Sequence, residues 1–288
     1  MTTHGGTDDI RGAIVLAVDG SEHADRALLW ATDQAALERR HLAVVTVDDG
    51  RADRDEPRHL VDHATAADVR RQPDISVVPL VLSGDPRQVL IDASGEAFML
   101  VLGSRGRGPF ASMTLGSVSA AVSAEAQCPV VVCRPVAAGP KRSGVVVGAD
   151  GTPESLPVIE FAYRMAFLRG VPLTVLHSFF DAAVAVAQYH ETRGEEPDVP
   201  DLEDLRASLA QSVAGLGEDY PGVPVSFTVK HGLADQALTP RDDGWDLVIV
   251  GRHPMTSLER VLTQSIATAV VERARVPVAV VPEMRSGT

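Results

Sequence analysis

A glycine-rich segment in the first half of this 288-residue chain has the residue types and spacing needed to bind a phosphate group. Gly103 and Gly106 follow an apolar run that begins at Phe98, and Gly116 and Ser117 come after nine further residues. A strand that ends in such a loop and leads into a helix directs backbone N–H groups and a helix N-terminus toward one point, which favours an anion. The segment therefore predicts a nucleotide-binding loop.

Two further strand ends are expected to meet this loop. Asp19 follows an apolar run at 14–18, and Val47 ends a run that starts at residue 42. In an open parallel sheet, ligands bind beyond the carboxyl ends of the strands, where the winding direction reverses. We expect Asp19 to bind ribose or the adenine amino group, the backbone near Val47 to face the base, and the loop with Ser117 to bind phosphates. Asp19 is alternatively only a turn residue before Gly20.

The basic residues and histidines near the loop give weaker signals. Arg105 and Arg107 either balance phosphate charge or are simply solvated, and the sequence favours neither interpretation. His23, His177 and His253 have no partner at the spacing of a metal site or a catalytic triad. We therefore expect neither kind of site at these histidines.

The chain repeats its motifs in the same order. Asp19-Gly-Ser recurs as Asp150-Gly-Thr, and the glycine at 103 recurs as Gly251. The sequence distance between matching residues is larger for Gly103 and Gly251 than for Asp19 and Asp150. The second copy therefore contains an insertion, which we expect at about 181–200. Two repeats of this length predict two similar domains, as does the chain length.

Short apolar runs alternate with helical patterns throughout the first half. Strict alternation of this kind predicts an α/β fold, with a parallel sheet covered by helices on both sides. Each strand is apolar throughout, so we expect burial on both faces. The second half repeats this pattern, with Thr152 as an expected N-cap. Strands are expected at 13–18, 42–47, 76–81, 99–102 and 130–133, and helices over 24–35 and near 59–70, 86–94 and 117–125.

Composition excludes several classes of protein. The net charge of −13 argues against nucleic acid as a partner, because affinity for nucleic acid comes from clustered basic residues. Cys128 and Cys133 lie on opposite faces of an expected strand, so we expect buried thiols and no disulfide. No run approaches the roughly 18 apolar residues of a membrane span, and the polar start lacks the apolar core of a signal peptide. A soluble, cytoplasmic protein is expected.

The loop pattern G-x2-G-x9-G-[ST], together with Asp19, Val47 and Gly84, resembles that of universal stress proteins of the ATP-binding class. The doubled arrangement is similar to the tandem two-domain members common in actinobacteria. The resemblance covers about 12–135 and 143–283. It implies two tandem Rossmann-like (HUP-type) domains, each a five-stranded parallel sheet in the order 3-2-1-4-5 flanked by helices. It also implies that the final strands of the two domains pair with each other.

The domain boundaries follow from this resemblance. We expect a nucleotide-binding domain over 12–135, a linker over 136–142 and a second domain over 143–283. The termini, 1–11 and 284–288, are expected to be flexible.

The resemblance implies that the first domain binds ATP, with or without Mg²⁺. We expect no catalytic residue and no residue that ligates a metal. The contacts are expected at the three strand ends and the start of the helix after the loop: Ala17, Val18, Asp19, Val47, Leu102, Gly103, Arg105, Gly106, Gly116, Ser117, Val118 and Ser119.

The second copy departs from the loop pattern. Pro254 stands where the first copy has its middle glycine, and Gln264 where it has Gly116. Proline removes an N–H donor, and Gln264 is expected to strain a backbone that needs a positive φ. Glu259 adds an acid that a phosphate avoids. We therefore expect one ATP per chain, bound by the first domain.

Three functions remain open from the sequence. The first is a non-catalytic ATP-binding regulator of a stress or growth-state response. The second is a slow ATPase or self-phosphorylating protein, and the third is an interaction module that needs no nucleotide. The chain lacks the pattern G-x4-G-K-[ST], and the first loop holds no evident base to activate water, so we expect no enzyme. The expected partners are an adenine nucleotide and an unidentified protein. We also expect the two domains to pair within the chain, allow for a homodimer, and expect no association with a membrane.

Overall fold

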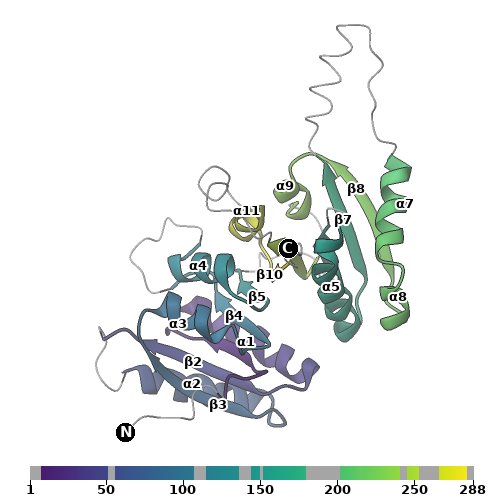
Figure 1. The fold of residues 1–288 in the computed structure, drawn as a ribbon. Helices are drawn as coiled ribbons and strands as arrows, with labels where there is room; N and C mark the ends of the chain where they lie inside the picture. The colour runs from purple at the N-terminus through teal and green to yellow at the C-terminus, as the bar shows by residue number, and fades with distance from the viewer. Residues whose placement is uncertain are drawn as a thin grey trace, which may run out of the picture. The chain divides into compact units, whose positions relative to one another are not determined.

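A computed structural model describes residues 8–50, 56–106, 115–135, 144–149, 152–179, 202–240, 245–252 and 266–283. The chain divides into two compact units. Unit 1 comprises Met1–Ala138 with Val271–Pro282, and unit 2 comprises Gly139–Val270 with Glu283–Thr288. Figure 1 shows the elements of both units, which are described separately below.

Unit 1 contains a parallel sheet in the order β3-β2-β1-β4-β5. On either side of the central strand, Ile14 pairs with Leu42 and with Met99. The side chains of β1, β4 and β5 are almost entirely buried, as continuous apolar runs predict. The α/β class and the strand order expected from the sequence are confirmed. The strands are β1 (Ile14–Ala17), β2 (Leu42–Asp48), β3 (Val77–Ser83), β4 (Met99–Gly103) and β5 (Val130–Cys133).

Helices connect the strands of unit 1 and cover the sheet (Figure 1). Ser21 caps the first helix, and Asp85 caps the third by accepting from Arg87 N at 2.9 Å. Alanines at helical spacing from Ala24 to Ala35 form the buried stripe of the first helix. The helices are α1 (Glu22–Glu38), α2 (Glu56–Arg71), α3 (Pro86–Ala93) and α4 (Ser117–Glu125).

Strand β3 differs from the expectation of burial on both faces. Its side chains are only half-buried, and Val81 is 37% exposed. The order of the sheet gives the reason, since β3 is the terminal strand and pairs with β2 alone. Apolar content alone does not distinguish such an edge strand from a central one.

The opposite edge of unit 1 is completed by the last strand of the chain. Strand β10 (Val278–Pro282) runs antiparallel to β5, with Val278 opposite Val132. Arg134 extends this contact, because its guanidinium donates to the carbonyls of Glu272 at 2.9 Å and Ala274 at 3.1 Å. These carbonyls lie at the end of α11 (Ile266–Arg273) and just beyond it. The expected pairing of the two final strands is confirmed, and β5 is not a free edge.

Unit 2 repeats the topology of unit 1. Its parallel strands follow the order β9-β6-β7-β8, which matches β4-β1-β2-β3. Gly84 after β3 and Gly232 after β8 both have positive φ, at 137° and 129°. The strands are β6 (Val145–Gly148), β7 (Leu173–Phe179), β8 (Val225–His231) and β9 (Leu247–Arg252).

The helices of unit 2 are η1 (Pro153–Ser155), α5 (Leu156–Arg169), α7 (Leu202–Ser212), α8 (Leu216–Asp219) and α9 (Ala234–Leu238). Thr152 precedes the first of them as expected, but this is a 3-10 turn, and the threonine side chain makes no capping hydrogen bond. The ring of Tyr220 lies 6.1 Å from that of Tyr163 and 5.9 Å from that of Phe167, which joins α5 to the end of α8.

Several expectations fall outside the described residues. These are the linker at 136–142, the insertion at 181–200, the terminus at 284–288 and the second loop, with Pro254, Glu259 and Gln264. Arg107 and His253 also lie outside the described residues. Within the start that was expected to be flexible, Ile10 is buried and Arg11 pairs with Glu96 at 3.0 Å.

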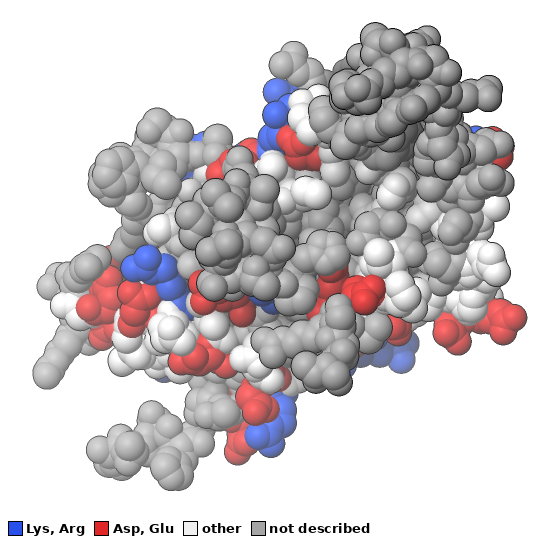
Figure 2. All heavy atoms as spheres, turned by 45° about the horizontal axis from the view of Figure 1, so that its top comes forward, with Lys and Arg blue, Asp and Glu red and all other residues white. Residues whose placement is uncertain are grey.

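Two observations on the described residues concern the cysteines and the apolar character of the helices. Cys128 and Cys133 are buried and form no disulfide. Among the described helices, none combines the length and apolar character that crossing a membrane requires. On the face drawn in Figure 2, acidic side chains of the described residues alternate with smaller basic groups.

Candidate functional site

Unit 1 contains a cavity of about 890 Å³ at the carboxyl ends of β1, β2 and β4. All twelve residues predicted from the sequence to contact a nucleotide line it, although they come from four separate segments. Their role in binding stays a prediction. The residues are Ala17, Val18, Asp19, Val47, Leu102, Gly103, Arg105, Gly106, Gly116, Ser117, Val118 and Ser119.

Asp19 both shapes a turn and lines the cavity. Its Oδ1 accepts hydrogen bonds from Ser21 N at 3.1 Å and Ser21 Oγ at 2.7 Å. Ser21 Oγ accepts in turn from Ala24 N, and it lies 3.3 Å from the carbonyl oxygen of Arg105. The start of α1 is thereby joined to the loop after β4, so the turn interpretation and the cavity interpretation of Asp19 are compatible.

Two glycines let that loop approach α1 closely. A Cβ on Gly103 would lie 2.7 Å from the carbonyl carbon of His23, and one on Gly106 would lie 2.6 Å from Asp19 Oδ2. Neither spacing is available to another residue without displacement of the neighbouring atoms. The first two glycines of the motif are therefore required by close packing.

Gly116 serves a different purpose from the one expected. Its φ of −71° and ψ of 151° are open to any residue, so the expectation of a positive φ at this position is wrong. A Cβ there would meet Arg105 Cα at 3.4 Å, an ordinary contact. Gly116 instead donates its N–H to the Ser104 carbonyl at 2.9 Å, and Ser119 Oγ donates to the Gly103 carbonyl at 2.7 Å. These two bonds fix the start of α4 beside the loop.

The N-terminus of α4 lines the cavity through Ser117, Val118 and Ser119. Gly116 at the N-cap supplies no side chain to satisfy the first N–H groups, which have no acceptor within a helix. Those donors and the positive end of the helix dipole favour an anion at this end of the cavity.

The rest of the wall was not predicted from the sequence. It is mainly apolar, with two carboxylates, and comes from β2, the start of α1, the segment that follows β2, α2 and α3. No local motif marks these positions, because an apolar residue on a helix has the same spacing whether it faces a cavity or the sheet. The unpredicted residues are His23, Ala24, Val45, Thr46, Asp49, Glu56, Pro57, Leu60, Pro86 and Leu90.

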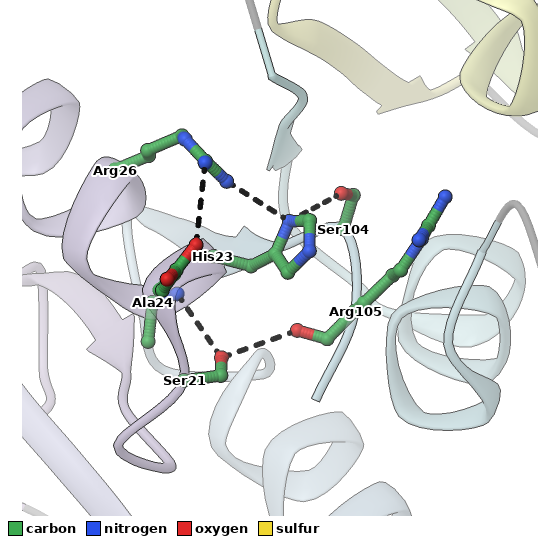
Figure 3. A network of polar contacts seen from close by, with 7 residues as sticks. Ser21, His23, Ala24, Arg26, Ser104 and Arg105 are labelled. Atoms are coloured by element: carbon green, nitrogen blue, oxygen red, sulfur yellow. Dashed lines mark hydrogen bonds and ion pairs between the residues drawn. The ribbon is translucent and has the colours of Figure 1, made fainter. Parts of the chain in front are cut away.

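His23 has polar partners on two sides (Figure 3). Its Nδ1 lies 3.3 Å from Arg26 Nη1 and 3.2 Å from Ser104 Oγ. Partial burial lowers the pKa of His23, and the charges of Arg26, Arg105 and Arg134 lower it further, against a smaller opposing effect of Asp19. No group of three or more potential metal ligands occurs among the residues the structure describes.

The matching positions of unit 2 are filled differently. Leu238 of α9 is almost fully buried, and a Cβ on Gly148 at the end of β6 would lie 3.0 Å from its Cδ1. At the end of β9, the carboxylate of Glu283 occupies the space beside Gly251, where a Cβ would overlap it. His177 Nδ1 contacts the Ala149 carbonyl at 2.8 Å, as Thr46 Oγ1 does with the Val18 carbonyl in unit 1.

Comparison with known proteins agrees with the fold and the repeat. The model of the universal stress protein family matches residues 11–134 and again residues 142–282. Universal stress protein Rv2005c of Mycobacterium tuberculosis is 33% identical over 294 residues, which covers 93% of this chain and 96% of that protein. A universal stress protein of Mycolicibacterium smegmatis is 30% identical over 293 residues, with 93% and 96% covered.

A solved structure shows the same fold over the whole length. The crystal structure of a universal stress protein from Archaeoglobus fulgidus superimposes with a TM-score of 0.67 at 18% identity, over 96% of this chain and 99% of that one. Two family matches in tandem, with relatives of equal length, leave one assignment: the chain belongs to the universal stress protein family.

Proposed function

We propose that unit 1 binds one adenine nucleotide, ATP, and that the chain acts as a non-catalytic regulator of a stress or growth-state response. The observation that carries the proposal is the convergence of four separate sequence segments on one cavity at the carboxyl edge of the sheet. Membership of the universal stress protein family supports the link to stress.

The cavity has the size and the chemical division that a nucleotide needs. Its volume of about 890 Å³ lies in the usual range for small-molecule sites. Arg105 and the open N-terminus of α4 line the β4 side, where phosphates would bind. Val47, Leu60 and Leu90 line the β2 side and suit a planar base.

Magnesium is compatible with this arrangement. In nucleotide sites Mg²⁺ keeps several waters and takes most of its other ligands from phosphate oxygens, so one or two protein carboxylates suffice. Asp19 was not predicted from the sequence to bind a metal, but it lines the cavity beside Gly106 and could supply such a carboxylate. ATP would then bind as its magnesium complex, with no protein cluster of metal ligands required.

The polar groups near the loop favour binding over hydrolysis. Asp19 Oδ1 accepts two hydrogen bonds from Ser21, and His23 Nδ1 is in contact with Arg26. A general base must reach the attacking water with a free acceptor atom, and these two acceptors already have donors. A cytoplasmic location completes the proposal, supported by two buried cysteines that form no disulfide.

Mass spectrometry of the small molecules released on denaturing the purified chain tests the proposal directly. We expect an adenine nucleotide in near-stoichiometric amount, or its binding on addition of ATP with Mg²⁺ in titration calorimetry. A chain that neither carries nor binds a nucleotide would favour an interaction module instead. Phosphate release near the median enzyme turnover of about 10 s⁻¹ would contradict a non-catalytic role.

A further inference from the structure

His23 stands at the phosphate side of the cavity with one ring nitrogen already occupied. Its Nδ1 contacts Arg26 Nη1 and Ser104 Oγ, and the other nitrogen lies on the side of the ring that faces Arg105 (Figure 3). The ring is partly buried and lines the cavity together with Arg105. Gly103 lets the backbone of His23 pack directly on the end of β4.

The partners of Nδ1 determine the protonation state of the ring. A guanidinium only donates hydrogen bonds, so Nδ1 accepts from Arg26 and carries no proton. The Ser104 hydroxyl then also donates to Nδ1, and the single ring proton is on Nε2. A neutral ring with its proton on Nε2 accounts for both contacts, and it directs an N–H donor to the side of Arg105.

Charges around His23 come from four separate elements. Arg26 lies on its own helix, Arg105 in the loop after β4 and Arg134 after β5, while Asp19 lies before α1. Glu22 pairs with Arg26 at 3.8 Å and Glu272 acts on Arg134, but the charges that act on the ring itself are three cations and one carboxylate, so their sum is positive. This charge adds to burial in disfavouring the protonated ring, and it also favours an incoming anion.

We propose that His23 is a phosphate-binding residue of this cavity and that it takes up a proton from solvent when the phosphates of a nucleotide enter. The inference rests on the function proposed above. Phosphate charge offsets the positive charge around the ring and adds a negative partner beside it, and both effects favour the protonated ring against the opposing effect of burial. The imidazolium then donates from Nε2 to the phosphate and adds one positive charge to the anion site. Its Nδ1–H no longer accepts from Arg26 and instead donates to the Ser104 oxygen.

The sign of the pH dependence follows from the two protonation states. Without ligand the pKa of His23 is below its ordinary value, through burial first and the arginines second. With phosphate bound the pKa rises. A ligand that raises the pKa of a group binds more tightly as the pH falls from the pKa with ligand to the pKa without ligand. The affinity rises by about tenfold for each unit by which the two pKa values differ. Affinity is thus highest in mildly acid solution.

Calorimetry of the full chain with ADP and with adenosine, between pH 8 and pH 5.5, tests the inference. As the pH falls over this range, we expect the affinity for ADP to rise about tenfold more in the native chain than in His23→Gln. Binding to the native chain should also take up as much as one proton, which is measured from how the binding enthalpy depends on the ionisation enthalpy of the buffer. Titration of the phosphate of ADP itself contributes equally to both proteins. Adenosine lacks phosphate and is expected to bind without this proton uptake.

Two further variants separate phosphate binding from a purely structural role. Arg26→Gln removes the cation that donates to Nδ1, so it should raise the ligand-free pKa of His23 and reduce the proton uptake. His177→Gln replaces a histidine of unit 2 whose Nδ1 contacts a backbone carbonyl, and should leave the uptake unchanged. The histidine resonances, assigned by loss of one signal in His23→Gln, give the pKa directly by NMR.

The outcomes are distinct for the two proposals. ADP binding with the same pH dependence in the native chain and His23→Gln, or a His23 pKa that ADP does not raise, would overturn the inference alone. Failure of the native chain to bind ADP and ATP at any pH would overturn the proposed function, and this inference with it.

Discussion

Gly106 and Asp19 meet more closely than any side chain at position 106 would allow. A Cβ at this position would lie 2.6 Å from Asp19 Oδ2, so even alanine must displace the carboxylate. Gly106→Ala should therefore weaken nucleotide binding by about tenfold or more, which corresponds to roughly 1.4 kcal/mol. Titration calorimetry with ATP measures this change.

Gly215→Ala is the matched control for that substitution. Gly215 has helical backbone angles, and a Cβ there meets nothing within 4 Å. We expect native affinity in this variant. Equal affinities in Gly106→Ala and the native chain would show that the Asp19 carboxylate is not positioned by the loop.

Ser21 contributes to stability through the start of α1. Its Oγ accepts from Ala24 N and bonds to Asp19, so Ser21→Ala removes an N-cap and one support of the loop. A lost N-cap costs about 0.5–2 kcal/mol. Urea denaturation followed by circular dichroism should show this loss. Ser226→Ala, at an exposed position of β8 whose hydroxyl bonds only to Thr174 Oγ1 within the described part of the chain, should change stability by less than about 0.5 kcal/mol. A native midpoint in Ser21→Ala would contradict the capping role.

At the level of single residues, the sequence predicts one side of the cavity better than the other. Asp19 and the glycines are identifiable because strand ends and close backbone approach demand particular residue types. Leu60, Leu90 and His23 carry no such signal, since only the packing of α1, α2 and α3 decides which side chains face the cavity. For the same reason, the motif located Gly116 correctly but its backbone conformation was not predictable.

Among the elements, β10 has the clearest consequence for behaviour in solution. It covers the edge of β5, and Arg134 holds the preceding chain through two backbone carbonyls. An uncovered β5 would expose a short, apolar, unpaired edge, which promotes association between chains. A fragment of residues 1–138 should therefore form dimers or larger species as its concentration rises.

Size-exclusion chromatography with light scattering measures the mass of that fragment, with the full chain at equal concentration as the control. Adding a synthetic peptide of residues 271–283 should restore the mass of a single fragment bound to the peptide. A fragment that stays monomeric and folded without the peptide would show that β5 needs no cover.

Element boundaries follow the sequence closely where burial is uniform. Strand β5 and helix α4 lie where the apolar run and the motif predict them. Strand β3 has the same apolar character but lies at the sheet edge, and its partial exposure depends on strand order. The order of the strands in the sheet is set by pairing between segments far apart in the sequence, and a local pattern holds no information about that pairing.

For the whole molecule, the repeat predicts two similar folds, but the two halves differ where a ligand would bind. Leu238 fills the space at Gly148, and the Glu283 carboxylate lies against Gly251 in unit 2. A carboxylate in that position repels phosphate, and a lost charge-assisted hydrogen bond costs roughly 1.5–3 kcal/mol, or tenfold or more in affinity. Calorimetry of the full chain should therefore give about one ATP per chain.

Asp19→Asn should remove most of the measured heat, because it alters the one occupied site, whereas Asp25→Asn on the exposed face of α1 should not. Two equivalent sites in the native chain would show that unit 2 carries the ligand as well. Unchanged stoichiometry and affinity in Asp19→Asn would show that Asp19 does not contribute to binding.

The pairing of β10 with β5 also affects how the chain is made. The ribosome releases β5 148 residues before β10 (278 − 130), which at about 5–20 residues per second is a delay on the order of 7–30 s. During that interval the first unit has a complete cavity but an open edge. Neighbouring nascent chains on one messenger carry the same edge, so the growing protein depends on spacing between ribosomes, or on chaperones, until its last strand emerges.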